Sequence, residues 1–167
     1  IHLQVSELIT DRILAELRTG SLDAGVVATS VADRQLQAWP LYRERFYAYV
    51  SPSSALYEKS YIIPDDIDPN DLWLLEEGHC FRRQIQKLCE LSRSSQTGSS
   101  FQYRSGSIET LIRLVERNGG ITILPEMAVR ELTPDKQQYV RPLEAPTPAR
   151  EVALLIHREQ VKTRLIE

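Results

Sequence analysis

The sequence has no apolar run that approaches the roughly 20 residues a membrane-spanning helix needs. Its first residues, Ile1 to Val5, lack the basic and apolar regions of a secretory signal peptide. Nothing in the sequence directs the chain out of the cytosol. We therefore expect a cytoplasmic protein with no membrane partner.

The chain also lacks a surplus of positive charge. The chain carries 20 Lys and Arg against 23 Asp and Glu, which gives a formal net charge of −3. Proteins that bind nucleic acid usually carry a basic surplus, because Lys and Arg must neutralise phosphates. Arg82 and Arg83 form the densest basic spot, and two residues are too few for a DNA-binding surface. We expect that any DNA contact is made by another segment of the protein.

The chain has only two cysteines, Cys80 and Cys89. A small secreted domain held together by disulfides would use more. The spacing of these cysteines, with His79 beside the first, does not match a zinc site, and no thioredoxin-like Cys-x-x-Cys is present. No Ser-His-Asp order and no phosphate-binding glycine loop is present either. We expect no metal, no other cofactor and no enzyme activity.

What is present indicates an α/β fold. The alternation of Ile1, Leu3 and Val5 predicts a half-buried strand, and helical spacing follows from Ile9 to Leu17. A turn after Gly20 then leads into a short buried strand. The strand-helix-strand order favours parallel pairing.

Later segments continue the mixture of strands and helices. Two strands are expected around Pro40, and Ser107 is a suitable N-cap for a helix that Gly119 and Gly120 end. The other expected elements are a buried strand at 72–75, a helix at 81–91, and strands at 121–124, 138–143 and 151–157.

Cys80 stands where the strand 72–75 has ended and the helix 81–91 begins. The N–H groups and the positive dipole end of a helix N-terminus favour thiolate over thiol, and a thiolate is the nucleophile that attacks peroxide. His79, Arg82 and Arg83 add positive charge nearby.

Cys89 follows near the end of the same predicted helix, where neither aid applies, so it suits a resolving role. Both cysteines also suit a plain structural role as small buried side chains. The residues alone leave the two interpretations open.

The segment from Leu75 to Cys80, together with Arg82, Gln84 and Cys89, closely resembles the redox segment of the OxyR family of peroxide sensors. OxyR proteins are a branch of the LysR-type transcription regulators. Three further segments are typical of LysR effector domains in general: residues 17–23 (Leu-Arg-Thr-Gly-Ser-Leu-Asp), 106–111 (Gly-Ser-Ile-Glu-Thr-Leu) and 120–125 (Gly-Ile-Thr-Ile-Leu-Pro).

This resemblance implies a two-lobed fold like that of periplasmic binding proteins, with parallel or mixed sheets flanked by helices. Residues 1–43 and 150–167 would form lobe I, incomplete at its N-terminus. Residues 44–149 would form lobe II, which carries the redox cysteines. The N-terminal helix-turn-helix of the family would be absent from this chain.

The resemblance also implies roles for individual residues. Hydrogen peroxide would oxidise Cys80 to a sulfenic acid, which would form a disulfide with Cys89 and refold the domain. Thr10, His79 and Arg150 would line the peroxide pocket. Arg83 departs from the family, where a carboxylate is familiar, and would add positive charge near Cys80.

The implied partners are hydrogen peroxide and further copies of the chain, in a homodimer or homotetramer. The full protein would bind DNA through its N-terminal part and act as a transcription activator in oxidative stress. RNA polymerase and a thiol reductant such as glutaredoxin or thioredoxin are further possible partners. Two alternatives stay open: a LysR-type domain that binds a small organic effector between its lobes, and a thiol peroxidase.

Overall fold

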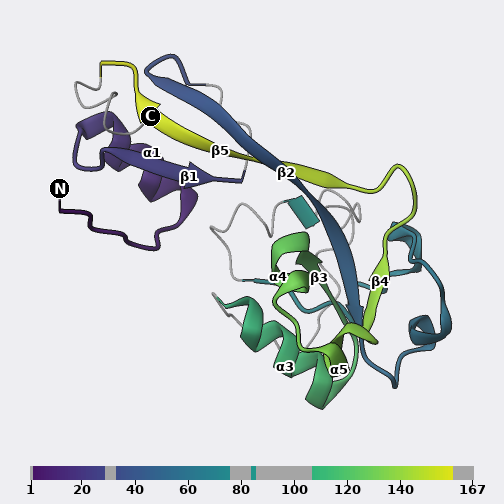
Figure 1. Cartoon of the computed structure of the whole chain (residues 1–167). Helices are drawn as coiled ribbons and strands as arrows, with labels where there is room; N and C mark the ends of the chain where they lie inside the picture. Colours follow the sequence, from purple (N-terminus) through teal and green to yellow (C-terminus); the bar gives the residue numbers. More distant parts are fainter. Residues whose placement is uncertain (1, 29–32, 76–83, 86–106, 160–167) are drawn as a thin grey trace. The chain divides into compact units, whose positions relative to one another are not determined.

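A computed structural model of the chain describes residues 2–28, 33–75, 84–85 and 107–159 (Figure 1). Contacts between Cα atoms divide the chain into two compact units. Unit 1 comprises Ile1–Arg43 and Glu151–Glu167, and unit 2 comprises Glu44–Arg150. Two strands contribute residues to both units, namely β2 (Leu36–Val50) and β5 (Ala149–His157).

Unit 1 packs one helix, α1 (Thr10–Thr19), against a small sheet. Strand β1 (Ala24–Val27) pairs antiparallel with β5, and β5 lies between β1 and β2. Leu17 of α1 is fully buried against Val27, Leu36 and Leu155. A methyl group on Gly25 would lie 2.5 Å from Ile13 Cγ2, so glycine permits this close approach of helix and strand.

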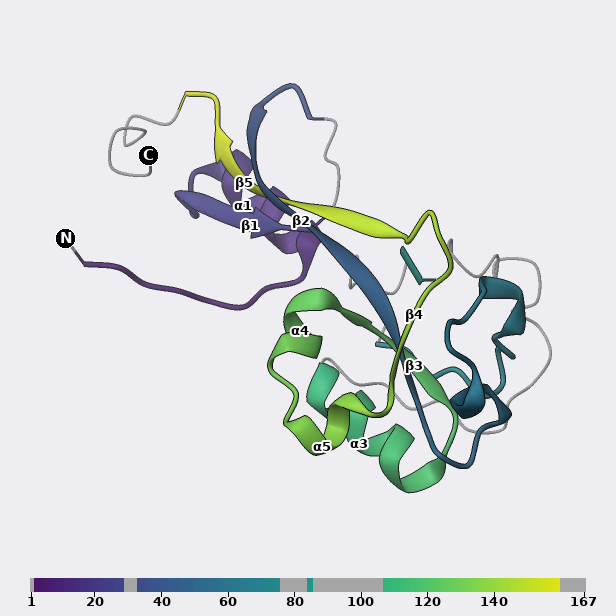
Figure 2. The same ribbon diagram turned by 45° about the vertical axis from the view of Figure 1, so that its right-hand side comes forward.

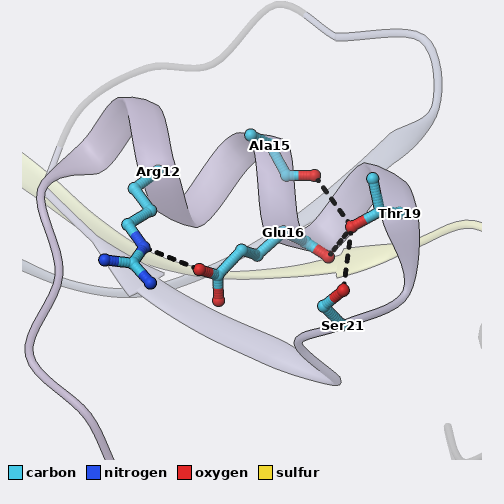
Figure 3. A network of polar contacts seen from close by, with 5 residues as sticks. All are labelled: Arg12, Ala15, Glu16, Thr19 and Ser21. Carbon is cyan, nitrogen blue, oxygen red and sulfur yellow. Dashed lines mark hydrogen bonds and ion pairs between the residues drawn. The ribbon is translucent and has the colours of Figure 1, made fainter.

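The C-terminus of α1 shows why the helix stops where the sequence predicts (Figure 3). Gly20 adopts the left-handed conformation, with φ of 74°. The backbone N–H groups of Ser21 and Leu22 donate to the Glu16 carbonyl oxygen, and the Thr19 hydroxyl donates to the carbonyl oxygens of Ala15 and Glu16. The last carbonyl groups of the helix thus receive the partners that a helix end otherwise lacks.

Unit 2 is built on the second half of β2, which pairs antiparallel with β3 (Ile121–Pro125) and with β4 (Val140–Pro142). Helices α3 (Ile108–Asn118), α4 (Glu126–Arg130) and α5 (Pro134–Gln137) lie together on one side of this unit in both views (Figures 1 and 2). Two short 3-10 helices, η1 (Ala55–Glu58) and η2 (Pro64–Asp66), follow β2.

Apolar periodicity explains the core of unit 2. Helix α3 buries Leu111, Ile112 and Val115, which follow one another at helical spacing, and all five residues of β3 are buried. The main core cluster comprises Phe46, Ala48, Val50, Ile62, Ile67, Leu75, Ile85, Leu111, Ile121, Ile123 and Leu143. The predicted α/β class with a mixed sheet and flanking helices is therefore confirmed.

The strand predicted at Ile1 to Val5 is wrong. Residues 2–9 form no strand, and Leu3 and Val5 are 81% and 83% exposed. The alternation of apolar residues is real, but a strand also needs a neighbour for its main-chain N–H and C=O groups. Within the part of the chain that the structure describes, no strand pairs with this segment.

Three other expectations about strands also fail. Leu36 to Val50 form one continuous strand, since the exposed Pro40 does not interrupt it. The parallel pairing expected between a strand at 1–5 and the strand after Gly20 is not formed, because residues 2–9 form no strand and β1 pairs antiparallel with β5. The segment 72–75 makes a single parallel bridge, Leu72 to Ile121, and is not a strand.

Tyr49 provides a testable polar contact inside unit 2. Its buried hydroxyl donates to Glu116 Oε1 at 2.8 Å, and Lys136 Nζ lies 2.7 Å from the same oxygen. Burial raises the pKa of Tyr49, and the hydrogen bond to Glu116 adds to this, so the phenol stays protonated. Burial also raises the pKa of Glu116, but hydrogen bonds from Lys136 and Tyr49 outweigh it and hold that pKa below its ordinary value.

We predict that Tyr49→Phe lowers the free energy of unfolding at pH 7 by about 1 kcal/mol, the usual value of one hydrogen bond. Because the folded pKa of Glu116 is depressed, its stabilising effect is present above the ordinary carboxyl pKa and is lost as the pH falls through the folded value. The difference between wild type and variant should therefore shrink at acid pH. Urea titrations at several pH values measure it. Tyr61→Phe is the control, because Tyr61 is 50% exposed, and an equal loss in both variants would contradict the prediction.

Candidate functional site

The residues predicted to carry the redox chemistry are Cys80 and Cys89, with His79, Arg82 and Arg83 beside them. All five lie outside the described residues. The structure does describe the chain on both sides of Cys80, at Leu75 and at Gln84 and Ile85. These flanking residues define how the candidate redox segment is attached to unit 2.

On the N-terminal side, the chain is fixed by three hydrogen bonds to β3 and a fourth to Gly119, just before β3. The backbone N–H of Trp73 donates to the Ile121 carbonyl oxygen at 2.9 Å, and the Ile121 N–H donates to the Asp71 carbonyl oxygen at 2.9 Å. The Thr122 hydroxyl donates to the Trp73 carbonyl oxygen, and Trp73 Nε1 donates to the Gly119 carbonyl oxygen, each at 2.9 Å. The segment 71–73 therefore has a fixed position on the sheet.

Gly120 makes this attachment possible. Its φ is +85°, a conformation that residues with a side chain rarely adopt. A methyl group on Gly120 would lie 2.4 Å from the Asp71 carbonyl oxygen and 3.1 Å from Trp73 Nε1. Only glycine lets segment 71–73 approach β3 this closely.

Apolar contacts hold both sides of the redox segment in one core. Leu75 is 4% exposed and Ile85 is fully buried, and both belong to the main core cluster of unit 2. They stand five positions before and five positions after Cys80. Gln84 and Ile85 are helical, and the rest of the helix predicted at 81–91 lies outside the described residues. The residues on the two sides of Cys80 are thus anchored in the same core, at Leu75 and at Ile85.

Arg150, predicted to line a peroxide pocket, is half-buried and makes an ion pair with the buried Glu44 within unit 2. Its Nε lies 3.0 Å and its Nη2 2.9 Å from Glu44 Oε2. The side chains are 15% exposed for Arg150 and 3% for Glu44. The guanidinium also lies over the Phe46 ring, 5.8 Å from its centroid, within the range of a cation–π contact.

Thr10, the other described member of the predicted pocket set, is the first residue of α1 and is 6% exposed. It belongs to unit 1, whereas Arg150 belongs to unit 2. The peroxide pocket itself stays a prediction.

Sequence reasoning missed Glu44. Residues two apart in a strand face the same side, and Glu44, Phe46, Ala48 and Val50 are all buried. A carboxylate in register with three buried apolar residues was a visible signal of a partnered charge. The identity of its partner was not visible, because Arg150 is 106 positions away.

The ion pair gives a prediction about stability. Arg150→Ala would leave the Glu44 carboxylate buried without this partner, and breaking a buried pair typically costs about 3 to 5 kcal/mol. We expect the free energy of unfolding to fall by about 3 kcal/mol in a urea titration. The double variant Glu44→Leu with Arg150→Met should recover most of this loss, because neither member of this pair is then left without the other. Arg130→Ala breaks the exposed pair with Glu126 and should cost less than about 1 kcal/mol. Equal losses for Arg150→Ala and Arg130→Ala would contradict the prediction.

The described residues contain no group of three or more His, Cys, Asp or Glu side chains that could hold a metal ion. Among the helices described, none is long and apolar enough to span a membrane.

Comparisons with known proteins agree with the motifs. The chain matches the LysR substrate binding domain over residues 1–167. The hydrogen peroxide-inducible genes activator of Haemophilus influenzae is 32% identical over 150 residues, which cover 89% of this chain and 48% of that protein. The HTH-type transcriptional regulator EstR of Acinetobacter baylyi is 30% identical over 129 residues, which cover 77% of this chain and 42% of that protein.

The crystal structure of an OxyR mutant from Porphyromonas gingivalis superposes with a TM-score of 0.87 at 36% identity, covering 99% of this chain and 76% of that chain. The chain spans about half the length of the curated relatives it matches. It belongs to the LysR substrate binding domain family and, within that family, is similar to the OxyR proteins that its redox motif predicted.

Proposed function

We propose that this chain is the redox-sensing regulatory domain of a peroxide-responsive transcription regulator. One observation carries the proposal: the Gly78-His79-Cys80 motif and Cys89 occur in a chain similar to hydrogen peroxide-inducible activators. A LysR-type domain with a small-molecule ligand has no need of this pair of thiols. The attachment of segment 71–73 to β3 supports the proposal, because it gives the segment that carries Cys80 a fixed origin.

The proposed chemistry has two steps. The Cys80 thiolate attacks one oxygen of hydrogen peroxide, an S–O bond forms, the O–O bond breaks, and hydroxide leaves with the electron pair. The Cys89 thiolate then attacks the sulfur of the resulting sulfenic acid and displaces its oxygen, which leaves as water after protonation. In sum, two thiols and one hydrogen peroxide become one disulfide and two water molecules. A dithiol protein such as glutaredoxin or thioredoxin would reduce the disulfide to two thiols by exchange and would itself be oxidised to a disulfide.

Forming this disulfide requires a change of backbone. If residues 80–89 are helical in the reduced form, nine positions at about 1.5 Å each separate the two Cα atoms by roughly 13 Å. A disulfide needs Cα atoms within about 7 Å. The helix must therefore unwind in part, and this unwinding would disrupt the packing of Ile85 in the core. We propose that this refolding of lobe II, residues 44–149, changes the association of the full regulator as a homodimer or homotetramer.

Several further residues complete the proposed mechanism. Thr10, His79 and Arg150 would contact peroxide, and Arg82 and Arg83 would favour the thiolate of Cys80 by their charge.

The full protein would contact DNA and RNA polymerase, with DNA bound by its N-terminal part. On this proposal the chain is a sensor that reacts once per signal, and not an enzyme that turns over.

A second candidate function is the binding of a small organic effector. The similarity to EstR, whose name mentions no peroxide, favours keeping this candidate. The two functions differ in a simple experiment on the isolated chain. After addition of one equivalent of peroxide, the sensor should lose both titratable thiols and recover them on treatment with a dithiol. An effector-binding domain would keep its thiols and show a saturable rise in melting temperature with its ligand. A thiol peroxidase would go on consuming peroxide as long as dithiol is supplied.

A further inference from the structure

We propose that Glu44 is a positioning residue for the peroxide reaction, because it holds the Arg150 guanidinium in the orientation in which Arg150 assists oxidation of Cys80. This inference rests on the proposed function, in which Arg150 contacts peroxide. It adds a residue that the redox motif does not contain and that lies on a different strand, β2.

The geometry fixes the guanidinium from two sides. Both Nε and Nη2 of Arg150 lie within 3.0 Å of a single carboxylate oxygen of Glu44. The central carbon of the guanidinium lies over the ring of Phe46, which is 3% exposed. Glu44 and Phe46 stand two positions apart on β2, so their side chains face the same side of the strand. An arginine held by a buried carboxylate and a buried ring loses most of its rotamer freedom before any substrate arrives.

The backbone keeps these groups together. The Phe46 N–H donates to the Pro148 carbonyl oxygen at 2.9 Å, which joins β2 to the chain two residues before Arg150. Phe46 also pairs with Pro125 of β3, so this part of β2 has a neighbour on each side. The sheet thus fixes the position of Glu44, and Glu44 in turn orients the guanidinium of Arg150.

The oxidation step benefits from a positive charge that is held in a fixed position. As the Cys80 thiolate attacks, the O–O bond breaks and negative charge develops on the leaving hydroxide. A fixed guanidinium stabilises that charge without having to reorganise during the reaction. A displacement of about 1 Å in such a group can slow a reaction on the order of a hundredfold.

Glu44 also has an electrostatic effect of the opposite sign. If Arg150 kept its place without Glu44, loss of the negative charge would strengthen the positive potential around the guanidinium and oxidation would be unchanged or faster. If Glu44 is needed to place Arg150, oxidation becomes slower. The direction of the change therefore separates a positioning role from a purely electrostatic one.

The test compares Glu44→Ala and Glu44→Gln with wild type and with Arg150→Ala and Arg150→Lys, all in the 167-residue chain. The rate constant for oxidation of Cys80 by hydrogen peroxide is measured at the peptide level by mass spectrometry. The rate of alkylation of the same thiol by iodoacetamide is measured in parallel, since alkylation needs the thiolate but produces no hydroxide. Circular dichroism defines conditions under which each variant is folded. Glu44→Gln keeps the size of the side chain and a carbonyl oxygen that can accept a hydrogen bond from Arg150. It therefore tests the inference even if Glu44→Ala does not fold.

We expect Glu44→Ala to slow oxidation at least about tenfold and Glu44→Gln about threefold, while alkylation changes less than about twofold. Glu16→Gln is the matched control, because it removes one carboxylate from the Arg12–Glu16 pair on α1 (Figure 3) and should leave oxidation unchanged.

Other outcomes separate the inference from the proposed function. Slow oxidation in the Arg150 variants with wild-type or faster rates in both Glu44 variants would overturn the inference alone. Rapid oxidation in wild type that no Arg150 variant slows would remove the role of Arg150, and the inference with it. Wild-type oxidation no faster than that of free cysteine would overturn the proposed function, and the inference with it.

Discussion

Replacing Cys80 by serine should abolish the reaction of the chain with peroxide, a loss of several orders of magnitude in rate. A serine hydroxyl stays protonated at neutral pH and is not oxidised by peroxide, so no sulfenic acid can form. Cys89 should not compensate, because it lies near the predicted end of a helix, where the helix dipole does not favour the thiolate. The measurement is the fraction of oxidised thiol after a short pulse of peroxide, quenched with an alkylating reagent.

Cys89→Ser is the informative counterpart. The first step should proceed at nearly the wild-type rate, but the sulfenic acid on Cys80 should then persist, since no resolving thiol is present. A dimedone-type reagent should trap it. Equal oxidation of Cys80 and Cys89 during the pulse, or an unaltered rate in Cys80→Ser, would contradict the assignment of roles.

Gly120→Ala should strongly destabilise unit 2. The new methyl group would lie 2.4 Å from the Asp71 carbonyl oxygen, which is backbone and has no free rotation by which to move away. Holding alanine at a φ of +85° costs about 1 to 3 kcal/mol, and the steric overlap adds a similar amount. We expect a loss of about 2 to 6 kcal/mol in the free energy of unfolding, measured by urea titration of the 167-residue chain.

A matched variant separates backbone strain from steric overlap. Gly20 has a similar φ of +74°, and no heavy atom lies within 4 Å of the position that a methyl group would take. Gly20→Ala should therefore cost only the strain, about 1 kcal/mol. If both alanine variants lose the same stability, then the contact between Gly120 and segment 71–73 is not what holds that segment. If the attachment does place the redox segment, Gly120→Ala should also slow oxidation of Cys80 under folding conditions.

Local patterns in the sequence were sufficient for the elements that bury one face. Helix α3 was found from the spacing of Ile108, Leu111 and Val115, and its end from Gly119, because these signals depend only on neighbouring residues. Strand β3 was found from a short apolar run for the same reason. Pairing was not found, since it depends on which strands meet in space. For this reason the sequence wrongly predicted a strand at Leu3 and Val5, which are exposed in the structure. It also did not predict the antiparallel pairing of β1 with β5.

The candidate site likewise has a part that the sequence could predict and a part that it could not. The motif around Cys80 is contiguous and could be recognised in the sequence, as could its resemblance to OxyR. The contacts that support it join residues far apart in the chain. Trp73 reaches the Gly119 carbonyl oxygen across 46 positions, and Arg150 reaches Glu44 across 106. No local pattern predicts such partners, although a buried glutamate in an apolar strand shows that one must exist.

The proposed function depends on a reversible disulfide that Cys80 and Cys89 form in response to peroxide. Its most direct test is peptide mapping by mass spectrometry of the 167-residue chain after one equivalent of hydrogen peroxide. We predict one pair of peptides linked through Cys80 and Cys89, formed in stoichiometric yield and lost again on treatment with a dithiol. Two free thiols after the treatment, or Cys80 oxidised without a link to Cys89, would contradict the claim.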